Sequence, residues 1–189
     1  MKYNIEQLIT KGGTDKRKKF IFFWGNQPDK SWQISASCFS QWWLSQFEEE
    51  GLFYSSSEQY MMAKKALLFE DVEIFHRIME ANSPAEAKDL GRKIRNFDEN
   101  VWNEHRYDIV VKGNLLKFSQ NEAIGRFLKN TNERILVEAS PVDRIWGIGL
   151  AANDERVNDP EQWQGLNLLG FALMEVRDEL KKVYKNYDK

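Results

Sequence analysis

The sequence predicts a mainly α-helical single domain with two or three short β-strands. Apolar residues recur at helical spacing in several segments, and many of these segments open on a residue type that caps helices. Only two runs have the aromatic and β-branched composition of strands, and both are short. These observations together give the fold class.

The first predicted element is a strand in KKFIFFWGN, residues 18–26, which ends at Gly-Asn. A helix is predicted at 55–69, in SSSEQYMMAKKALLF, with Ser55 or Ser56 as its N-cap. Glu58 lies three residues after Ser55, which is the spacing of a capping box.

Four further helices are predicted from apolar spacing, at 71–82, 98–118, 121–130 and 166–184. Another helix begins after Ser83, with Pro84 at its first helical position. ERILVEAS, at 133–140, is the second predicted strand. Residues 141–165 are mostly loop, because Pro, Asn, Asp and Gly interrupt any regular pattern there.

The chain has 189 residues, of which 42% are hydrophobic and 30% charged, as in an ordinary globular protein. We expect one domain at 20–189, preceded by a partly basic N-terminal segment at 1–19. The net charge of −2 gives no general attraction to nucleic acid. The basic run at 16–19 is a local exception, either a solvated loop end or a contact for nucleic acid.

A single cysteine, Cys38, excludes an internal disulfide framework and suits a reducing compartment. Nothing local pairs it with His76 or His105, so we expect a small buried side chain. Two histidines and one cysteine make a metal cluster improbable, and we expect no metal or cofactor. No apolar run has the length of a membrane span, so we expect a cytoplasmic protein that does not engage a membrane.

Glu58 and Lys65 are the first candidate catalytic pair. Seven helical positions make almost two turns, so these side chains share a face, whereas Lys64 points away and is expected to face water. Burial would favour a neutral lysine, which is a nucleophile, and a protonated glutamate, which is a general acid. The alternative is a capping glutamate and a lysine that extends from an amphipathic helix to water.

The segment DRIWGIGL, at 143–150, places an acid and a tryptophan before a Gly-x-Gly loop. Backbone amides in such a loop can approach a ligand closely, although a simple turn after a strand gives the same pattern. Asn167, in GLNLLG, is either a polar contact or a helix cap.

Arg92 suits phosphate by its bidentate geometry, or is a surface arginine. Several tryptophans beside polar residues are platforms for stacking a base, or core residues; they are Trp24, Trp42, Trp102, Trp146 and Trp163.

Six linked motifs resemble those of the NADAR family, also called YbiA-like, in their order and approximate separations. They are FSQWW, SSEQYMMAKK, GRKIRNFDENVW, KGNLLKF, DRIWGIG and GLNLLGFALMEVR, and the resemblance runs from about Phe22 to Leu180. The resemblance implies a mainly helical fold and an N-glycosidase that acts at the anomeric carbon of a ribose. One branch of the family cleaves phosphorylated ribosylamino-pyrimidines of riboflavin biosynthesis. Another removes ADP-ribose from guanine in nucleic acid, sometimes as the antitoxin of a DarT-type ADP-ribosyltransferase.

The resemblance also implies roles for particular residues. Glu58 matches the acidic catalytic residue, and Lys65 matches the lysine that is expected to form a Schiff base with the ring-opened ribose. Asp143 matches the acid before the glycine loop, a second catalytic candidate. The candidate substrate-binding residues are Gln41, Trp42, Ser57, Arg92, Trp102, Trp146, Gly147, Gly149 and Asn167.

Some positions depart from the family pattern. Gln41 stands where many relatives have asparagine, Gln59 where many have histidine, and Met61-Met62 replaces an aromatic–glutamine pair. Ile148 replaces an aspartate of the short, riboflavin-type members, so the glycine loop has one carboxylate fewer to repel a phosphodiester or pyrophosphate.

The absence of this aspartate and the basic run at 16–19 favour ADP-ribosylated guanine in nucleic acid as the substrate. They also favour a DarT-type toxin as the genetic partner. The alternatives are a phosphoribosylated pyrimidine of riboflavin biosynthesis and a non-catalytic module that binds NAD or ADP-ribose.

Overall fold

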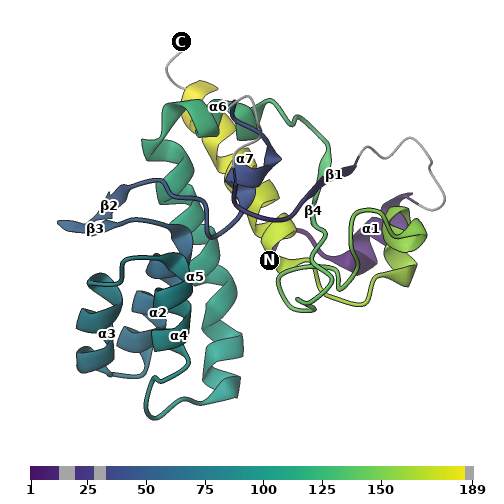
Figure 1. Ribbon diagram of the computed structural model, residues 1–189. Coiled ribbons are helices and arrows are strands. Elements are labelled where there is room, and N and C mark those ends of the chain that lie inside the picture. Colours follow the sequence, from purple (N-terminus) through teal and green to yellow (C-terminus); the bar gives the residue numbers. More distant parts are fainter. Residues whose placement is uncertain (13–19, 28–32, 186–189) are drawn as a thin grey trace. The chain divides into compact units, whose positions relative to one another are not determined.

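The computed structural model describes residues 1–12, 20–27 and 33–185, and Figure 1 shows its elements. The α-helices are α1 (Ile5–Gly12), α2 (Ser57–Leu68), α3 (Val72–Met79), α4 (Pro84–Gly91), α5 (Glu99–Gln120), α6 (Glu122–Lys129) and α7 (Leu168–Lys185). The strands are β1 (Phe20–Phe23), β2 (Phe47–Glu49), β3 (Leu52–Tyr54) and β4 (Ile135–Glu138). Short 3-10 helices are η1 (Ala36–Phe39), η2 (Glu155–Asn158) and η3 (Pro160–Gln162).

The predicted mainly α-helical class is confirmed. Every predicted helix is present, with ends that differ by a few residues, and α1 lies outside the predicted segments. The basic run at 16–19, and with it the expected boundary after residue 19, lies outside the described residues.

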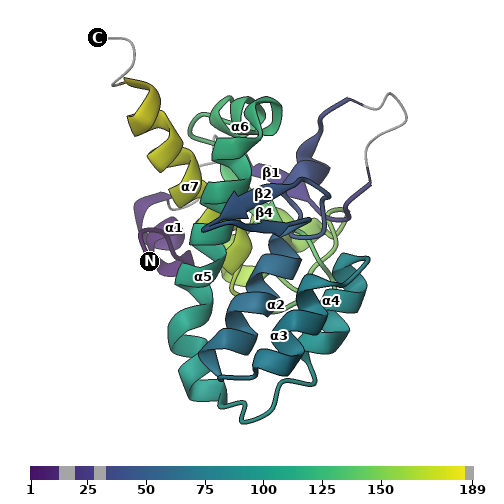
Figure 2. The same cartoon turned by 90° about the vertical axis from the view of Figure 1, so that its left-hand side faces the viewer.

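Residues Gln41–Glu122 form one compact unit, which we call the α2 unit. In this unit α2 packs against α3, α4 and α5 (Figure 2). Because three helices surround it, α2 is buried over most of its circumference, and the fully buried Ala63 and Ala66 let its neighbours approach closely. Its polar residues at the N-terminal end are therefore buried as well.

The helices around α2 begin at side-chain caps. Asp71 accepts a hydrogen bond from the Ile74 amide at the start of α3, and Asp98 accepts two from amides in the first turn of α5. Ser83 caps α4 with Pro84 at the first helical position, as predicted. Each cap satisfies amides that have no partner within the helix, so local sequence sets these helix starts.

The β2–β3 hairpin adds two strands to the two segments predicted as strands, so the described residues contain four strands where two or three were expected. Its two-residue turn consists of Glu50 and Gly51, which both have positive φ angles (54° and 82°), as a tight hairpin turn requires. Both strands are only three residues long, and β2 contains adjacent glutamates, which are depleted in strands, so the sequence does not indicate the hairpin.

The second compact unit, which we call the α7 unit, contains Met1–Ser40 and Ala123–Lys189. In it β1 pairs with β4 in parallel, and α7 packs against β4. Both strands were predicted, within 18–26 and 133–140. Cys38 in this unit is buried, as expected.

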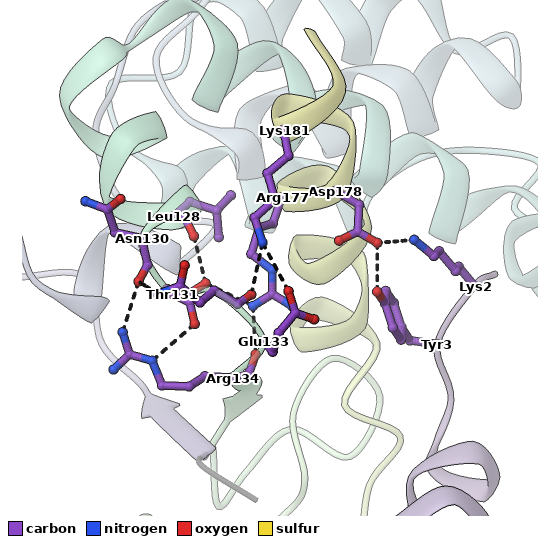
Figure 3. Close-up of polar contacts among 11 residues, drawn as sticks. Lys2, Tyr3, Leu128, Asn130, Thr131, Glu133, Arg134, Arg177, Asp178 and Lys181 are labelled. Atoms are coloured by element: carbon purple, nitrogen blue, oxygen red, sulfur yellow. Dashed lines mark hydrogen bonds and ion pairs between the residues drawn. The ribbon is translucent and has the colours of Figure 1, made fainter. Parts of the chain in front are cut away.

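Side chains of α7 bind two other segments of its unit, the turn before β4 and the N-terminal residues before α1 (Figure 3). Arg177 is 1% exposed, and its Nη1 donates to the Thr131 hydroxyl at 2.9 Å and to the Arg134 carbonyl at 2.7 Å, just before β4. Asp178 accepts from the Tyr3 hydroxyl at 2.7 Å and from the Lys2 ammonium group. The arginine that ends the GLNLLGFALMEVR motif therefore holds the turn that leads into β4.

Within the described ranges, no helix combines the length and the apolar character needed to cross a membrane. The same residues contain no group of three or more His, Cys, Asp or Glu side chains placed to hold a metal ion.

Candidate active site

The start of α2 differs from the predicted capping box. Ser56 is the N-cap, and its hydroxyl accepts from the Gln59 amide at 3.2 Å. The Gln59 side chain reaches back and accepts from the Ser55 amide at 2.7 Å. The predicted capping box of Ser55 and Glu58 is therefore wrong. The N-cap is Ser56, and the residue three positions after it is Gln59. This leaves the Glu58 carboxylate without the capping role that its spacing suggested.

Glu58 is 3% exposed, although ionised carboxylates are rarely buried. Its backbone amide donates to the Gln41 carbonyl at 3.0 Å, which ties the start of α2 to the segment before β2. The charge of Glu58 raises the pKa of Lys65, so the two residues interact electrostatically, as expected for a shared helix face.

The short-range contacts recorded for the Lys65 nitrogen are with a backbone carbonyl and two aromatic rings. It donates to the Gly91 carbonyl at 3.0 Å, and it lies 4.3 Å from the ring centroid of Phe97 and 5.5 Å from that of Trp102. Burial lowers the pKa of Lys65 below its ordinary value and outweighs the opposing effect of the Glu58 charge. The neutral, nucleophilic form of this lysine is thus more accessible than that of a surface lysine.

The contact between Lys65 and the Gly91 carbonyl depends on the absence of a side chain at Gly91. A Cβ atom there would lie 2.1 Å from the Met62 sulfur, so a larger residue would force the Met62 side chain or α4 to move. The glycine of the GRKIRNF segment thereby brings its carbonyl within reach of Lys65.

The expectation that Lys64 faces water is wrong. Its nitrogen is 2.6 Å from a carboxylate oxygen of the buried Glu49 and 5.3 Å from the ring centroid of Tyr60. Lys112 pairs with the other oxygen of Glu49 at 2.5 Å. The alternative, a capping glutamate beside a lysine that extends to water, therefore fits neither Glu58 nor either lysine.

A series of hydrogen bonds joins three buried polar side chains beside the start of α2. The Asn114 amide nitrogen donates to the Gln41 side-chain oxygen at 2.7 Å, and the Ser57 hydroxyl donates to the Asn114 side-chain oxygen at 3.4 Å. All three side chains are buried, so their hydrogen bonds fix one another. Asn114 was not among the predicted site residues, although it lies in the quoted motif KGNLLKF, where an asparagine inside a long helix is the available signal.

The other candidates of the α2 unit differ in exposure. Trp102 and Trp42 are half-buried, and the Lys88 nitrogen lies 5.7 Å from the Trp42 ring centroid. Arg92 is exposed and pairs with Asp89 at 2.9 Å, which is the arrangement of a surface arginine. No contact holds Arg92 toward Lys65 among those recorded for the described residues.

In the α7 unit, Asp143 organises the glycine loop. One of its carboxylate oxygens accepts from the amides of Ile145 and Trp146, both at 2.8 Å, and its carbonyl accepts from the Gly149 amide at 3.1 Å. Gly149 has a φ of +70°, which favours glycine. Trp146 is half-buried, and the side chain of Ile148 is fully buried.

Asn167 is fully buried in the same unit. Its side-chain oxygen accepts from the Glu138 amide at 3.0 Å, and its side-chain nitrogen donates to the Leu136 carbonyl at 2.9 Å, so it binds β4 to the start of α7. Its own amide donates to the carbonyl of Gly147, a buried residue. This placement is that of a structural asparagine that joins two elements, which differs from both a ligand contact and a helix cap.

We expect Asn167→Ala to lower the free energy of unfolding by about 2–4 kcal/mol, because it removes the side-chain partner of two backbone groups of β4 and forces alanine to a positive φ. The φ of Asn167 is 52°. Asn167→Gly relieves the backbone strain but not the lost hydrogen bonds, so it should destabilise less. Urea denaturation of both variants measures the difference, and equal stability of Asn167→Ala and the parent chain would contradict this role.

The candidates therefore fall into two groups. The α2 unit contains Gln41, Trp42, Ser57, Glu58, Lys65, Arg92 and Trp102, and the α7 unit contains Asp143, Trp146, Gly147, Gly149 and Asn167. In the α2 unit the structure brings Glu58, Lys65 and Trp102 together and adds Phe97, which sequence analysis missed.

A separate pocket of about 500 Å³ also lies in the α2 unit, and no predicted site residue lines it. It lies against Ser55 and Gln59 of the α2 start, the end of α3 and the hairpin residue Phe53. On a helix, Gln59 and Lys65 are about 120° apart, so this pocket adjoins a different flank of α2 from the one that carries Lys65.

Comparison with known proteins gives the family. The NADAR domain profile matches residues 22–181. N-glycosidase R617 of Acanthamoeba polyphaga mimivirus is 47% identical over 167 residues, which cover 85% of this chain and 96% of that protein. The riboflavin biosynthesis protein PYRR of Zea mays is 31% identical over 162 residues, which cover 80% of this chain but only 24% of that protein.

The fold is also known from a solved structure. The NMR structure of the Escherichia coli protein YbiA is similar with a TM-score of 0.71, at 24% identity and with 88% of each chain covered. The fold, the order of the motifs and the profile match agree: this chain belongs to the NADAR domain family.

Proposed function

We propose that this chain removes ADP-ribose from guanine in nucleic acid by cleaving the ribose C1′–N bond, with Lys65 as the nucleophile. The observation that carries the proposal is the setting of Lys65. Its nitrogen lies between a backbone carbonyl and two aromatic rings, and burial lowers its pKa. A lysine in such a setting is suited to attack an electrophilic carbon.

The coarser part of this function is shown by the family and its named relatives. The chain is a hydrolase that acts on N-glycosyl bonds, as the similar N-glycosidase R617 is named. The substrate and the covalent mechanism are our proposal.

The proposed chemistry begins with ring opening, in which the C1′–O4′ bond breaks, O4′ takes a proton from the acid, and C1′ and the base nitrogen become an iminium. The neutral Lys65 amine then forms a bond to C1′, and the proton that it loses returns to the acid. The bond from C1′ to the base nitrogen breaks, the base leaves with that proton, and Lys65 and C1′ remain joined as an imine. Water adds to C1′, the C1′–lysine bond breaks, and the sugar leaves as its aldehyde while the amine is regenerated.

We assign the acid to Glu58. Glu58 is buried on the helix that carries Lys65, and the two residues interact electrostatically. Asp143, the other candidate, uses a carboxylate oxygen to hold two amides of its own loop. We therefore assign Asp143 to loop organisation. Trp102 supplies an aromatic surface beside Lys65 that suits a stacked base.

The choice of ADP-ribosylated guanine rests on Ile148, which stands where riboflavin-type members have an aspartate, so the glycine loop carries no carboxylate at this position. A phosphoribosylated pyrimidine remains the second candidate substrate, because the similar maize protein is named for riboflavin biosynthesis. A non-catalytic ADP-ribose module would need neither a buried glutamate nor a lysine of lowered pKa.

Borohydride trapping tests both the mechanism and the substrate. The protein is incubated with an ADP-ribosylated guanine oligonucleotide or with a phosphorylated ribosylamino-pyrimidine, and borohydride then reduces any imine to a stable secondary amine. We expect intact-mass analysis to show a sugar adduct with the oligonucleotide, and peptide mapping to place it on Lys65.

Each other outcome changes the proposal in a defined way. An adduct with the pyrimidine riboside alone exchanges the substrate and keeps the mechanism. Release of free base without any adduct keeps the glycosidase and rejects the imine. Binding without release of base rejects the enzyme for that ligand, and Lys65→Arg is the control that must lose the adduct.

A further inference from the structure

Phe97 is the closest aromatic neighbour recorded for the Lys65 nitrogen. Its ring centroid is 4.3 Å away, compared with 5.5 Å for Trp102. Phe97 lies in the connection between α4 and α5, and 46% of its surface is exposed. One part of the ring thus covers the lysine, while the other part faces solvent.

The position of Phe97 is fixed from several sides. Its ring packs edge-on against Phe69, the residue after α2, with a centroid distance of 5.2 Å. The preceding residue, Asn96, has a φ of 56° and turns the chain. On the far side of this turn the Arg95 guanidinium binds the buried Asp71, and Asp98 caps α5 directly after Phe97.

We propose that Phe97 is a positioning residue for Lys65: its ring shields the lysine nitrogen from water and, with the Gly91 carbonyl, sets the direction in which that nitrogen points. The hydrogen bond to Gly91 at 3.0 Å and the ring contact come from two different segments, so together they restrict a side chain that is otherwise flexible.

The ring acts on the lysine in two opposite ways. Its negative face attracts the ammonium form and so raises the pKa, whereas the exclusion of water favours the neutral amine and so lowers it. The pKa of Lys65 is lowered and burial is the largest cause, which is the direction that exclusion of water by the ring predicts. In the part of α2, α3, α4 and α5 that the structure describes, the charged side chain whose field acts on Lys65 is Glu58, and it acts in the opposite direction.

Substitution of Phe97 tests this role. Phe97→Ala admits water, so we expect the Lys65 pKa to rise toward its ordinary value. Phe97→Leu keeps an apolar cover but removes the aromatic face, so the pKa should stay the same or fall. The pH dependence of acetylation of Lys65 by acetic anhydride, followed by mass spectrometry of its peptide, gives the pKa in each variant without any need for turnover.

Turnover supplies a second readout, which rests on the proposed function of Lys65. In Phe97→Ala the rising limb of the pH–rate profile should move to higher pH, with about tenfold lower turnover at neutral pH and recovery in alkaline buffer. A residue that only supports the fold would lower turnover at every pH. Phe53→Ala is the matched control, because Phe53 is another exposed phenylalanine of the α2 unit and lies away from the lysine.

The outcomes separate the two proposals. An unchanged or lowered Lys65 pKa in Phe97→Ala would overturn the shielding role. A raised pKa with unchanged turnover would support that role and reject Lys65 as the nucleophile. If Phe97→Ala does not fold, Phe97→Gln replaces it, because glutamine keeps length and admits water, and the same rise in pKa is expected.

Discussion

Lys65→Ala should lower the rate of base release by a factor on the order of a thousand or more, because it removes the group that forms the covalent bond to C1′. Lys65→Arg should be equally inactive, since a guanidinium stays charged at any accessible pH and has no free electron pair for the attack. The measurement is single-turnover release of guanine from an ADP-ribosylated oligonucleotide.

The fold of Lys65→Ala should survive. The recorded hydrogen bond of the Lys65 side chain is that to the Gly91 carbonyl. The free energy of unfolding should therefore change by no more than about 1 kcal/mol, the scale of one hydrogen bond. Full activity of a folded Lys65→Ala protein would exclude the imine mechanism.

Lys64→Ala is the matched control, since Lys64 is the adjacent lysine on the same helix. It pairs with the buried Glu49, which is left with Lys112 and the Tyr60 hydroxyl when Lys64 is removed. We expect a loss of about 1–2 kcal/mol in unfolding free energy, because one partner of a largely buried carboxylate is removed. Turnover should be retained. Lys64→Ala should therefore lower stability without loss of activity, whereas Lys65→Ala should lose activity with little loss of stability.

Glu58→Gln should lower the rate by a factor of about 10²–10⁴, the usual contribution of a general acid. Glutamine has nearly the same shape, so the buried site keeps its packing, but it cannot supply the proton that the leaving base requires. The loss should be smallest for substrates whose leaving group needs the least protonation. Rates with a series of ribosides of decreasing leaving-group basicity measure this dependence.

The same substitution should act on Lys65 in the opposite direction. The Glu58 charge raises the Lys65 pKa, so its removal should lower that pKa further. Acetylation of Lys65 at neutral pH should therefore become faster in Glu58→Gln while turnover falls. If the acetylation rate of Lys65 and the turnover rate both fall, Glu58 acts mainly by holding the lysine in place and is not the acid. Glu49→Gln is the control for loss of a buried carboxylate elsewhere in the α2 unit.

Local sequence was sufficient for most of the helices. Helical spacing of apolar residues and the caps at Ser56, Ser83 and Asp98 act within one or two turns, so they can be identified without knowledge of the rest of the chain. The same local geometry distinguished Lys65 from Lys64 as the lysine on the Glu58 face. Local composition did not predict the β2–β3 hairpin, because its strands are only three residues long, β2 contains two glutamates, and the pairing depends on the turn and on packing.

The sequence by itself determined the helical class, the family and the residue pair Glu58 and Lys65, because periodicity, caps and motif order are properties of neighbouring residues. Tertiary structure alone decided what surrounds that pair. The Gly91 carbonyl and the rings of Phe97 and Trp102 reach Lys65 from segments more than twenty residues away, and Glu49 draws Lys64 away from water. Burial and charge partners depend on such distant contacts, so the lowered pKa of Lys65 follows only from the folded arrangement.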